Sequence, residues 1–266
     1  MIARRALGHT VSHFGDFAPT WAVALFAFAA FVLFKISDAQ SAGTVEILGK
    51  WTPLFLKGFC NDILITLISM MIGTFLALLL AITRMAGNQF VRGTITAVTG
   101  ILRNVPGIVF LFFVAFALPY KFGVGAWELA FPAYAKVVFS FSLKIMANMA
   151  EVIRGGLQSI PIAQWEAGET IGLSRWQVFF RVALAQCIRR IAPATLNVFG
   201  IFFCAVPIAS LIGVESALTL AGYAIKAERQ THLILPIYAY VGSWYFGIGY
   251  LVFRLFKKYE SAQAWT

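Results

Sequence analysis

Long apolar runs separated by short polar segments dominate this chain of 266 residues. A helix needs about 20 apolar residues to cross the roughly 30 Å of bilayer hydrocarbon. Runs near this length predict spanning helices at residues 21–36, 63–82, 94–118, 132–151, 192–214 and 233–256. The pattern therefore predicts an all-α polytopic membrane protein with about six transmembrane helices, five of them forming a core that follows one N-terminal helix.

The first apolar run is short and follows Arg4 and Arg5, so it also fits the apolar region of a signal peptide. Lys35 and Asp38 make a weak cleavage context directly after it, which favours an uncleaved helix. We expect residues 1–57 to form the N-terminal tail, the first helix and a loop outside the cell membrane. Residues 58–260 are expected to form the main transmembrane domain.

The composition excludes a soluble protein. Sixty per cent of the residues are hydrophobic and 12% are charged, which leaves too little polar surface to cover a soluble globule of this size. The net charge of +10 does not indicate a nucleic-acid partner, because the cations lie between apolar runs and form no continuous basic face. The bilayer is the expected surrounding.

The distribution of Lys and Arg predicts how the helices are oriented. Six spans place 12 Lys and Arg side chains on one side of the membrane and seven on the other, with Arg103 and Lys144 inside spans. The side that is richer in cations is normally cytoplasmic. Both termini and the segment 152–190 are therefore expected to face the cytoplasm.

Cysteine and histidine do not predict a metal site. Cys60, Cys187 and Cys204 are an odd number without CxxC spacing, and the three histidines stand apart without an HExxH-like pairing. We expect no metal and no cofactor bound by this chain.

A polar, glycine-punctuated insert at about residues 155–190 interrupts the apolar pattern. Ser159 can cap a helix that has Pro161 in its first turn, and Gly172 supplies a left-handed stop. The spacing of Ser174 and Gln177 is that of a capping box, which starts a second helix. The insert therefore reads as helix, glycine, helix, and the first helix should project beyond the second.

This insert resembles the cytoplasmic EAA loop of permease subunits of ABC importers. Glu166, Ala167 and Gly172 match the family pattern, as does Leu184, whereas Gly168 replaces the second alanine and the proline after Leu184 is absent. The resemblance implies that the first helix couples to a cytoplasmic ATPase. Taken alone, Glu166 could instead be a solvated surface charge or pair with a neighbouring arginine.

Two departures from the EAA pattern affect the expected geometry of the insert. Gly168 should loosen the projecting helix by up to about 1 kcal/mol relative to alanine. The missing proline should let the second helix run on unbroken.

The resemblance extends to the polar amino-acid branch of the same family. It is carried by the stretch 150–161, by Arg103, Asn104 and Pro106, and by the stretch 210–214. It implies a multi-pass protein of the bacterial inner membrane that pairs with a second permease subunit, identical or homologous. It also implies two ATP-binding subunits holding ATP and Mg, and a periplasmic or surface-tethered solute-binding protein.

Polar residues inside spans are candidates for the translocation pathway. Lys144, Asn148 and Glu151 share one helical stripe, and such groups normally face a bundle interior or a water-filled path. The alternative is an ion pair of Lys144 with Glu151, or with the partner subunit, that serves assembly alone. Arg103 and Asn104 are further candidates, although Arg103 could snorkel where Asn104 and Pro106 restart a helix. Asn197 is a candidate that could instead serve helix packing.

The sequence leaves the substrate open. Cys204 to Pro207 replaces a polar run that is usual in the amino-acid branch. The solute could therefore be a polar amino acid or a relative such as an opine, or this subunit could be the half of a heterodimer that binds no solute. The chain has no Gly-x-x-x-x-Gly-Lys-Ser/Thr loop, so ATP hydrolysis is expected in a partner. An ATP-independent secondary transporter is the rival, but no internal repeat supports it. An intramembrane enzyme lacks a convergent reactive set.

Overall fold

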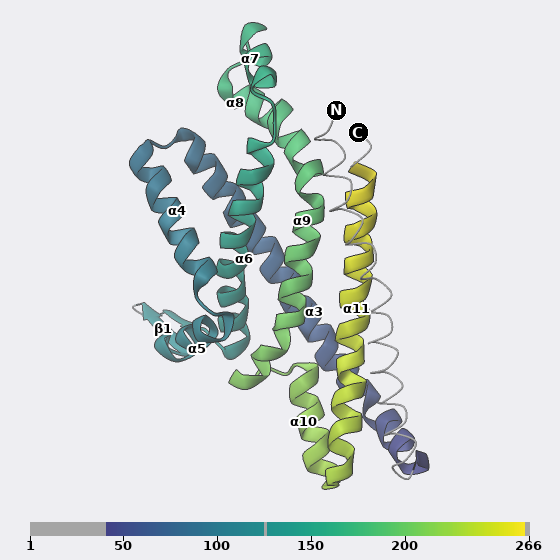
Figure 1. Ribbon diagram of the computed structural model, residues 1–266. Helices are drawn as coiled ribbons and strands as arrows, with labels where there is room; N and C mark the ends of the chain where they lie inside the picture. The colour runs from purple at the N-terminus through teal and green to yellow at the C-terminus, as the bar shows by residue number, and fades with distance from the viewer. Residues whose placement is uncertain (1–40, 125–126, 264–266) are drawn as a thin grey trace. The chain divides into compact units, whose positions relative to one another are not determined.

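The computed structural model describes residues 41–124 and 127–263, so the predicted first span and its signal-peptide alternative lie outside the described residues. The all-α prediction is confirmed, with one short hairpin added. The helices are α3 (Ser41–Ala86), α4 (Gln89–Asn104), α5 (Gly107–Ala117), α6 (Ala133–Gln158), α7 (Ile162–Thr170), α8 (Arg175–Val178), α9 (Leu184–Ala205), α10 (Ala217–Glu228) and α11 (Ile234–Gln263) (Figure 1).

Shorter elements complete the described chain. Phe179–Ala183 is π-helical, and Val206–Ile212 and Thr231–Leu233 are 3₁₀ segments. The strands β1 (Lys121–Val124) and β2 (Trp127–Ala130) pair antiparallel, with Lys121 opposite Ala130. The hairpin and α10 were not predicted, because four-residue strands and a twelve-residue helix fall below the length that an apolar run must reach to be recognised as a span.

The chain divides into two compact units. One contains residues 1–53 and 221–242 and the other contains residues 54–220 and 243–266. In the first unit, the side chains of Lys50 and Trp51 each donate a 2.7 Å hydrogen bond to Glu228. These bonds hold the pKa of the Glu228 carboxyl below its usual range. They tie the start of α3 to the end of α10.

Helix α6 is the centre of the second unit and packs against α4, α5 and α9. Its buried side chains join those of α3, α5 and α9 in one apolar core. Two glycines allow close helix approach: a Cβ at Gly73 would lie 2.7 Å from the carbonyl oxygen of Ser142, and one at Gly156 would lie 2.3 Å from Ile191 Cγ2. Small residues at such crossings are typical of membrane helices. This packing therefore sets the position of α6 relative to α3 and α9.

The predicted third span, residues 94–118, is not one helix. It consists of α4 and α5, whose axes differ by 101° across Val105 and Pro106. Proline has no N–H for the helix ladder, and it pushes the preceding residue into extended geometry, as the ψ of 129° at Val105 shows. The expected helix restart after Asn104 is confirmed, and the predicted span 94–118 consists of two helices.

The second helix of the insert is also not separate from the fifth predicted span. Residues 175–212 form one helical stretch through the π-helical segment, and Ala185 stands where the family pattern has its proline. The expectation of an unbroken run is therefore confirmed. The prediction that a separate span begins at residue 192 is wrong, because the helix is continuous there.

The number of membrane spans stays a prediction. Among the described residues, Gly43–Met85 and Arg175–Ile212 are long and apolar enough to cross a bilayer, and α4 with α5 would make a third if the bent pair counts as one span. Residues 41–57 belong to α3 rather than to a loop, because Pro53 is accommodated inside the helix.

Candidate functional site

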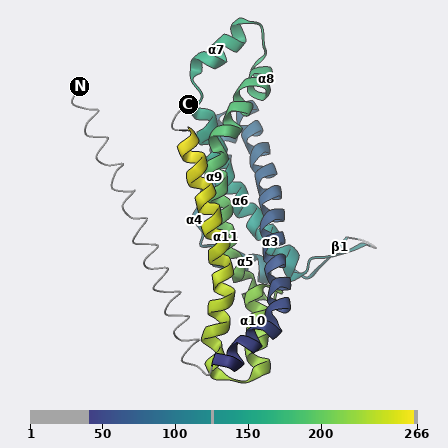
Figure 2. The ribbon, with the colours of Figure 1, turned by 90° about the vertical axis from the view of Figure 1, so that its right-hand side faces the viewer.

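The α7 to α8 insert lies at one end of the second unit, beyond the end of α6, as Figure 1 and Figure 2 both show. Its first turn differs from the prediction. Ser159 is still helical, so its hydroxyl donates back to the carbonyl oxygen of Gly156 at 2.7 Å, and Pro161 itself occupies the N-cap. Capping of α7 by Ser159 is therefore wrong, and the α7 N-cap makes no side-chain hydrogen bond.

The turn between α7 and α8 follows the sequence prediction. Gly172 has a φ of +83°, a left-handed conformation that favours glycine. The N–H of Leu173 then donates to the carbonyl oxygen of Gly168 at 3.1 Å, closing the helix end. Ser174 and Gln177 form the reciprocal capping box that was expected. These contacts set the angle between α7 and the α8 helix that follows it.

Gly168 explains one departure from the family pattern. It is buried against α8, and a Cβ there would lie 2.6 Å from Cγ2 of Val178, which is itself buried. A second alanine, as in the EAA pattern, does not fit beneath this valine. Gly168 therefore permits α7 to pack closely on α8, a role that its weak helix propensity alone did not indicate.

We expect Gly168→Ala to loosen the insert despite the gain in helix propensity. Overpacking costs about 1 to 3 kcal/mol, against about 1 kcal/mol gained from propensity. Hydrogen exchange over residues 161–180 should be faster in the variant. Adding Val178→Ala should restore part of the protection, because the two changes share one contact.

Gly155→Ala is the matched control for this substitution, since a Cβ at Gly155 meets nothing within 4 Å. It should leave exchange in the insert unchanged. Slower exchange in Gly168→Ala than in the native chain would contradict the packing role.

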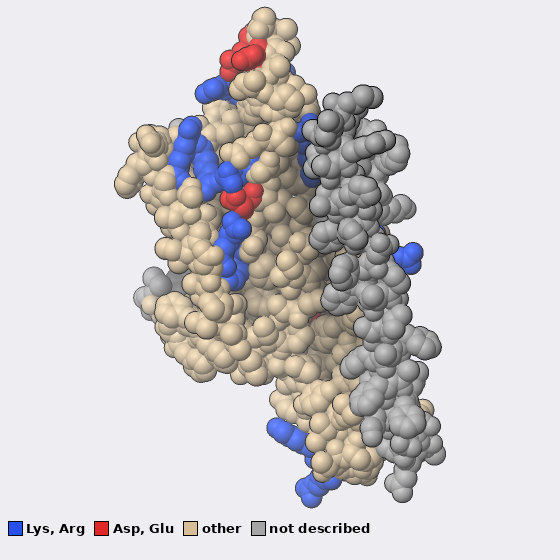
Figure 3. Space-filling model, in the orientation of Figure 1, with Lys and Arg blue, Asp and Glu red and all other residues tan. Residues whose placement is uncertain are grey.

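The outer face of α7 carries acidic side chains (Figure 3). Glu166 is exposed and makes no ion pair within the described part of the chain, whereas Glu169 pairs with Arg175 at 3.3 Å. The alternative in which Glu166 pairs with a neighbouring arginine is therefore not observed. Ala167, Ile162 and Ile171 are also exposed, so the acidic surface has apolar flanks. Leu184 lies apart from it, half-buried at the start of α9.

Lysines on α6 hold the ends of the broken helix pair. Lys144 is buried, with 8% of its surface exposed, and its Nζ donates to the carbonyl oxygens of Leu102 at 3.0 Å and Val105. Lys136 donates likewise to Ala115 at 2.6 Å and Leu118 at 2.7 Å. Each lysine thus satisfies carbonyls at the C-terminal end of one half, α4 or α5.

The lysines are needed at these helix ends because a bilayer offers the carbonyl oxygens no other hydrogen-bond donor. The last four carbonyls of a helix have no partner within the helix, and hydrocarbon offers no water to replace one. A cation there also interacts favourably with the helix dipole. Arginines do the same elsewhere: Arg92 donates to the carbonyl oxygen of Arg84 near the end of α3, and Arg190 to that of Ser159 after α6.

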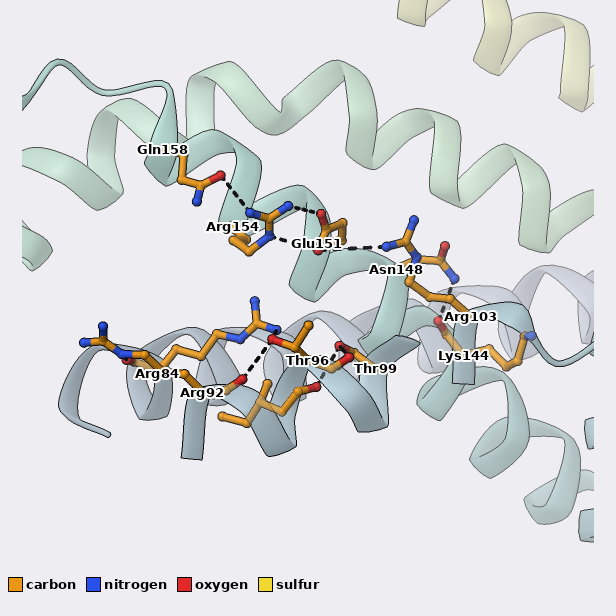
Figure 4. Close-up of polar contacts among 11 residues, drawn as sticks. Arg84, Arg92, Thr96, Thr99, Arg103, Lys144, Asn148, Glu151, Arg154 and Gln158 are labelled. Atoms are coloured by element: carbon orange, nitrogen blue, oxygen red, sulfur yellow. Dashed lines mark hydrogen bonds and ion pairs between the residues drawn. The ribbon is translucent and has the colours of Figure 1, made fainter. Parts of the chain in front are cut away.

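Glu151 pairs with arginines and not with Lys144. Arg154 donates to it through Nε at 3.0 Å and through Nη2, and Nη1 of Arg103 lies 3.9 Å away (Figure 4). The hypothesis of a Lys144–Glu151 ion pair is wrong. Asn148 Nδ2 donates to the carbonyl oxygen of Lys144 at 2.8 Å within α6.

The structure thus brings together four of the six predicted pathway residues, Arg103, Lys144, Asn148 and Glu151 (Figure 4). Asn104 is exposed at the end of α4 and Asn197 is exposed on α9, and no hydrogen bond joins either side chain to the others. Sequence reasoning missed Lys136 as a partner of α5. Its spacing of eight residues from Lys144, which places both on one side of α6, was the available signal.

Comparisons with known proteins agree with this architecture. A family model described as "Binding-protein-dependent transport system inner membrane component" matches residues 69–262. The probable amino-acid ABC transporter permease protein YckA of Bacillus subtilis (strain 168) is 32% identical over 166 residues, covering 62% of this chain and 71% of the relative.

A second relative covers more of the chain. The nopaline transport system permease protein NocM of Agrobacterium fabrum is 25% identical over 79% of this chain and 88% of its own length. Among solved structures, an amino acid ABC transporter crystallised with histidines superposes with a TM-score of 0.68 at 22% identity. That match covers 81% of this chain and 96% of the other, and it shows the fold.

Proposed function

Because the chain belongs to the family of inner-membrane components of binding-protein-dependent transport systems, we propose that it forms half of the translocation pathway of an ATP-driven importer. A second permease subunit, identical or homologous, forms the other half. The family description implies a solute-binding protein on the outer side of the membrane. Two ATP-binding subunits holding ATP and Mg supply the energy, since this sequence has no P-loop.

The insert is the observation that carries the proposal. Its α8 begins at a capping box, and α7 packs on α8 where Gly168 lies close to Val178. It presents the exposed carboxylate of Glu166, which makes no ion pair with the other described residues. A rigid projecting helix with an unpaired charge and apolar flanks is suited to docking in a cleft of another protein. Closure of the ATPases on ATP would then move α7, and with it α8 and α9, as a rigid body.

The orientation follows from the charge distribution. The insert carries Arg175, Arg181, Arg189 and Arg190, on the side of the chain that is richer in cations. We place the insert and both termini in the cytoplasm, where an ATPase has access to nucleotide.

The proposed solute is a polar amino acid or a close relative. YckA is described as a probable amino-acid permease, which favours an amino acid. NocM is described as a nopaline permease, which supports an opine as the alternative solute. The pathway candidates remain Arg103, Asn104, Lys144, Asn148, Glu151 and Asn197. Of these, Arg103 and Glu151 have charged groups that are partly open to their surroundings, whereas Lys144 is engaged by the α4 carbonyls. Arg103 and Glu151 are therefore the first positions to test for contact with solute.

Uptake by the reconstituted complex tests the function. Proteoliposomes containing the permease, its ATPase and its binding protein should take up at least one radiolabelled polar amino acid or opine. Uptake should require hydrolysable ATP and stop with a non-hydrolysable analogue. Uptake that is driven by an ion gradient without ATP would favour a secondary transporter. Failure of every amino acid and opine would overturn the substrate class.

A further inference from the structure

Three arginines surround one carboxylate where α3, α4 and α6 meet. This arginine cluster consists of Arg84 near the end of α3, Arg103 near the end of α4 and Arg154 on α6, around Glu151. The charge of Arg84 acts on both Glu151 and Arg154. Figure 3 shows basic side chains gathered around an acidic one below the acidic patch of α7. The cluster therefore holds an excess of two positive charges.

The cluster has hydrogen-bond donors to spare. Arg154 uses three nitrogens on Glu151 and Gln158, but Arg103 approaches Glu151 only to 3.9 Å and makes no hydrogen bond within the described residues. The Arg103 and Arg154 side chains are 43% and 42% exposed. Nε of Arg84 is buried and has no hydrogen-bond partner in the part of the chain that the structure describes. A second anion would neutralise the excess charge and accept these free N–H groups.

The depth of the cluster matches the membrane surface. From the start of α6 at Ala133 to Arg154 is a rise of about 31 Å, close to the thickness of the hydrocarbon core. The backbone next to Arg103 lies level with Lys144, which donates to the carbonyl oxygen of Leu102. The guanidinium of Arg103 instead lies near Glu151, about 10 Å further along α6. Arg103 thus extends toward the helix end, as a snorkelling side chain does.

We propose that the arginine cluster binds the phosphate of an anionic phospholipid headgroup. Guanidinium groups bind phosphate oxygens in pairs of parallel hydrogen bonds, and basic sites between membrane helices near the surface bind such headgroups. A free phosphate ion would share the chemistry of the headgroup, and the position of the cluster near the expected membrane surface favours the lipid.

Native mass spectrometry of the intact, delipidated complex tests the proposal, with phosphatidylglycerol and phosphatidylcholine titrated separately. Arg103→Gln should weaken phosphatidylglycerol binding about fivefold, from about 1 kcal/mol for each arginine near the surface. Binding of phosphatidylcholine should not change. Because Arg103 is largely exposed, the variant is expected to fold.

Arg254→Gln is the matched control, because Arg254 is an exposed arginine on α11 whose guanidinium lies over the ring of Tyr250. It should bind phosphatidylglycerol as the native complex does. Equal weakening by both variants, or none by Arg103→Gln, would overturn the proposal. Complete displacement of the lipid by millimolar inorganic phosphate would do the same, by assigning the cluster to a free ion. None of these outcomes depends on which solute is transported.

Discussion

Glu166→Arg is expected to reduce ATP-driven uptake to background while leaving the permease folded. Glu166 is exposed and makes no ion pair within the described chain, so the substitution breaks no contact in the permease itself. At a docked interface it places a cation where a carboxylate was. Losing one partner of a charge pair in an interface costs about 2 to 5 kcal/mol, which weakens association roughly 30-fold or more.

The control for this charge reversal is Glu128→Arg on the hairpin, where the glutamate is exposed and, among the described residues, forms an ion pair with Lys121 alone. ATPase co-purified with the permease should fall in Glu166→Arg and not in Glu128→Arg. The two variants should elute as single, monodisperse species with similar Tm. If Glu166→Arg retains native amounts of ATPase, α7 does not dock through this carboxylate.

Lys144→Met is expected to destabilise the broken helix pair. It removes two hydrogen bonds from a charged donor, worth about 1.5 to 3 kcal/mol each, and leaves the carbonyls of Leu102 and Val105 without that donor. Methionine also removes the cost of holding an ammonium in the membrane, about 2.5 to 3.5 kcal/mol. At the midpoints of these ranges the lost bonds outweigh this gain by about 1.5 kcal/mol, which lowers Tm by about 3 to 6 °C.

The measurement is thermal unfolding of the purified protein in one detergent. Lys57→Met is the control, because Lys57 lies on α3 with its charge exposed and its ion pair, within residues 41–263 as described, is with the exposed Glu215. That variant should unfold within about 1 °C of the native protein, as for a surface pair of small net value. A Tm of Lys144→Met that is equal to the native value would show that the lysine does not hold the end of α4.

The sequence predicted the insert better than the spans. Capping chemistry is local, so the roles of Gly172, Ser174 and Gln177 could be read from residue type and spacing. The role of Gly168 could not, because it depends on Val178, ten residues away on another helix. Ser159 was assigned wrongly because the residues around it allow both the end of one helix and the start of the next.

For the polar stripe on α6, too, the sequence predicted the positions within one helix but not the contacts with another helix. Its helical spacing placed Lys144, Asn148 and Glu151 on one side, and the structure keeps them there. The carbonyl oxygens that accept from Lys144 and the Arg103 guanidinium near Glu151 belong to the end of α4, next to the 101° bend at Pro106. An apolar pattern predicts length and not direction, so neither the bend nor the capping lysines followed from it. Lys136 and Lys144 have a structural role, because they donate to carbonyl oxygens at the ends of the two helices on either side of the bend.

Site-specific crosslinking at the insert measures the central claim most directly. A photoreactive amino acid in place of the exposed Ala167 should form a covalent product with the ATPase in the assembled complex. The same residue in place of Glu128, on the exposed hairpin, should form none. If position 167 gives no product with the ATPase while position 128 does, the insert is not the coupling element.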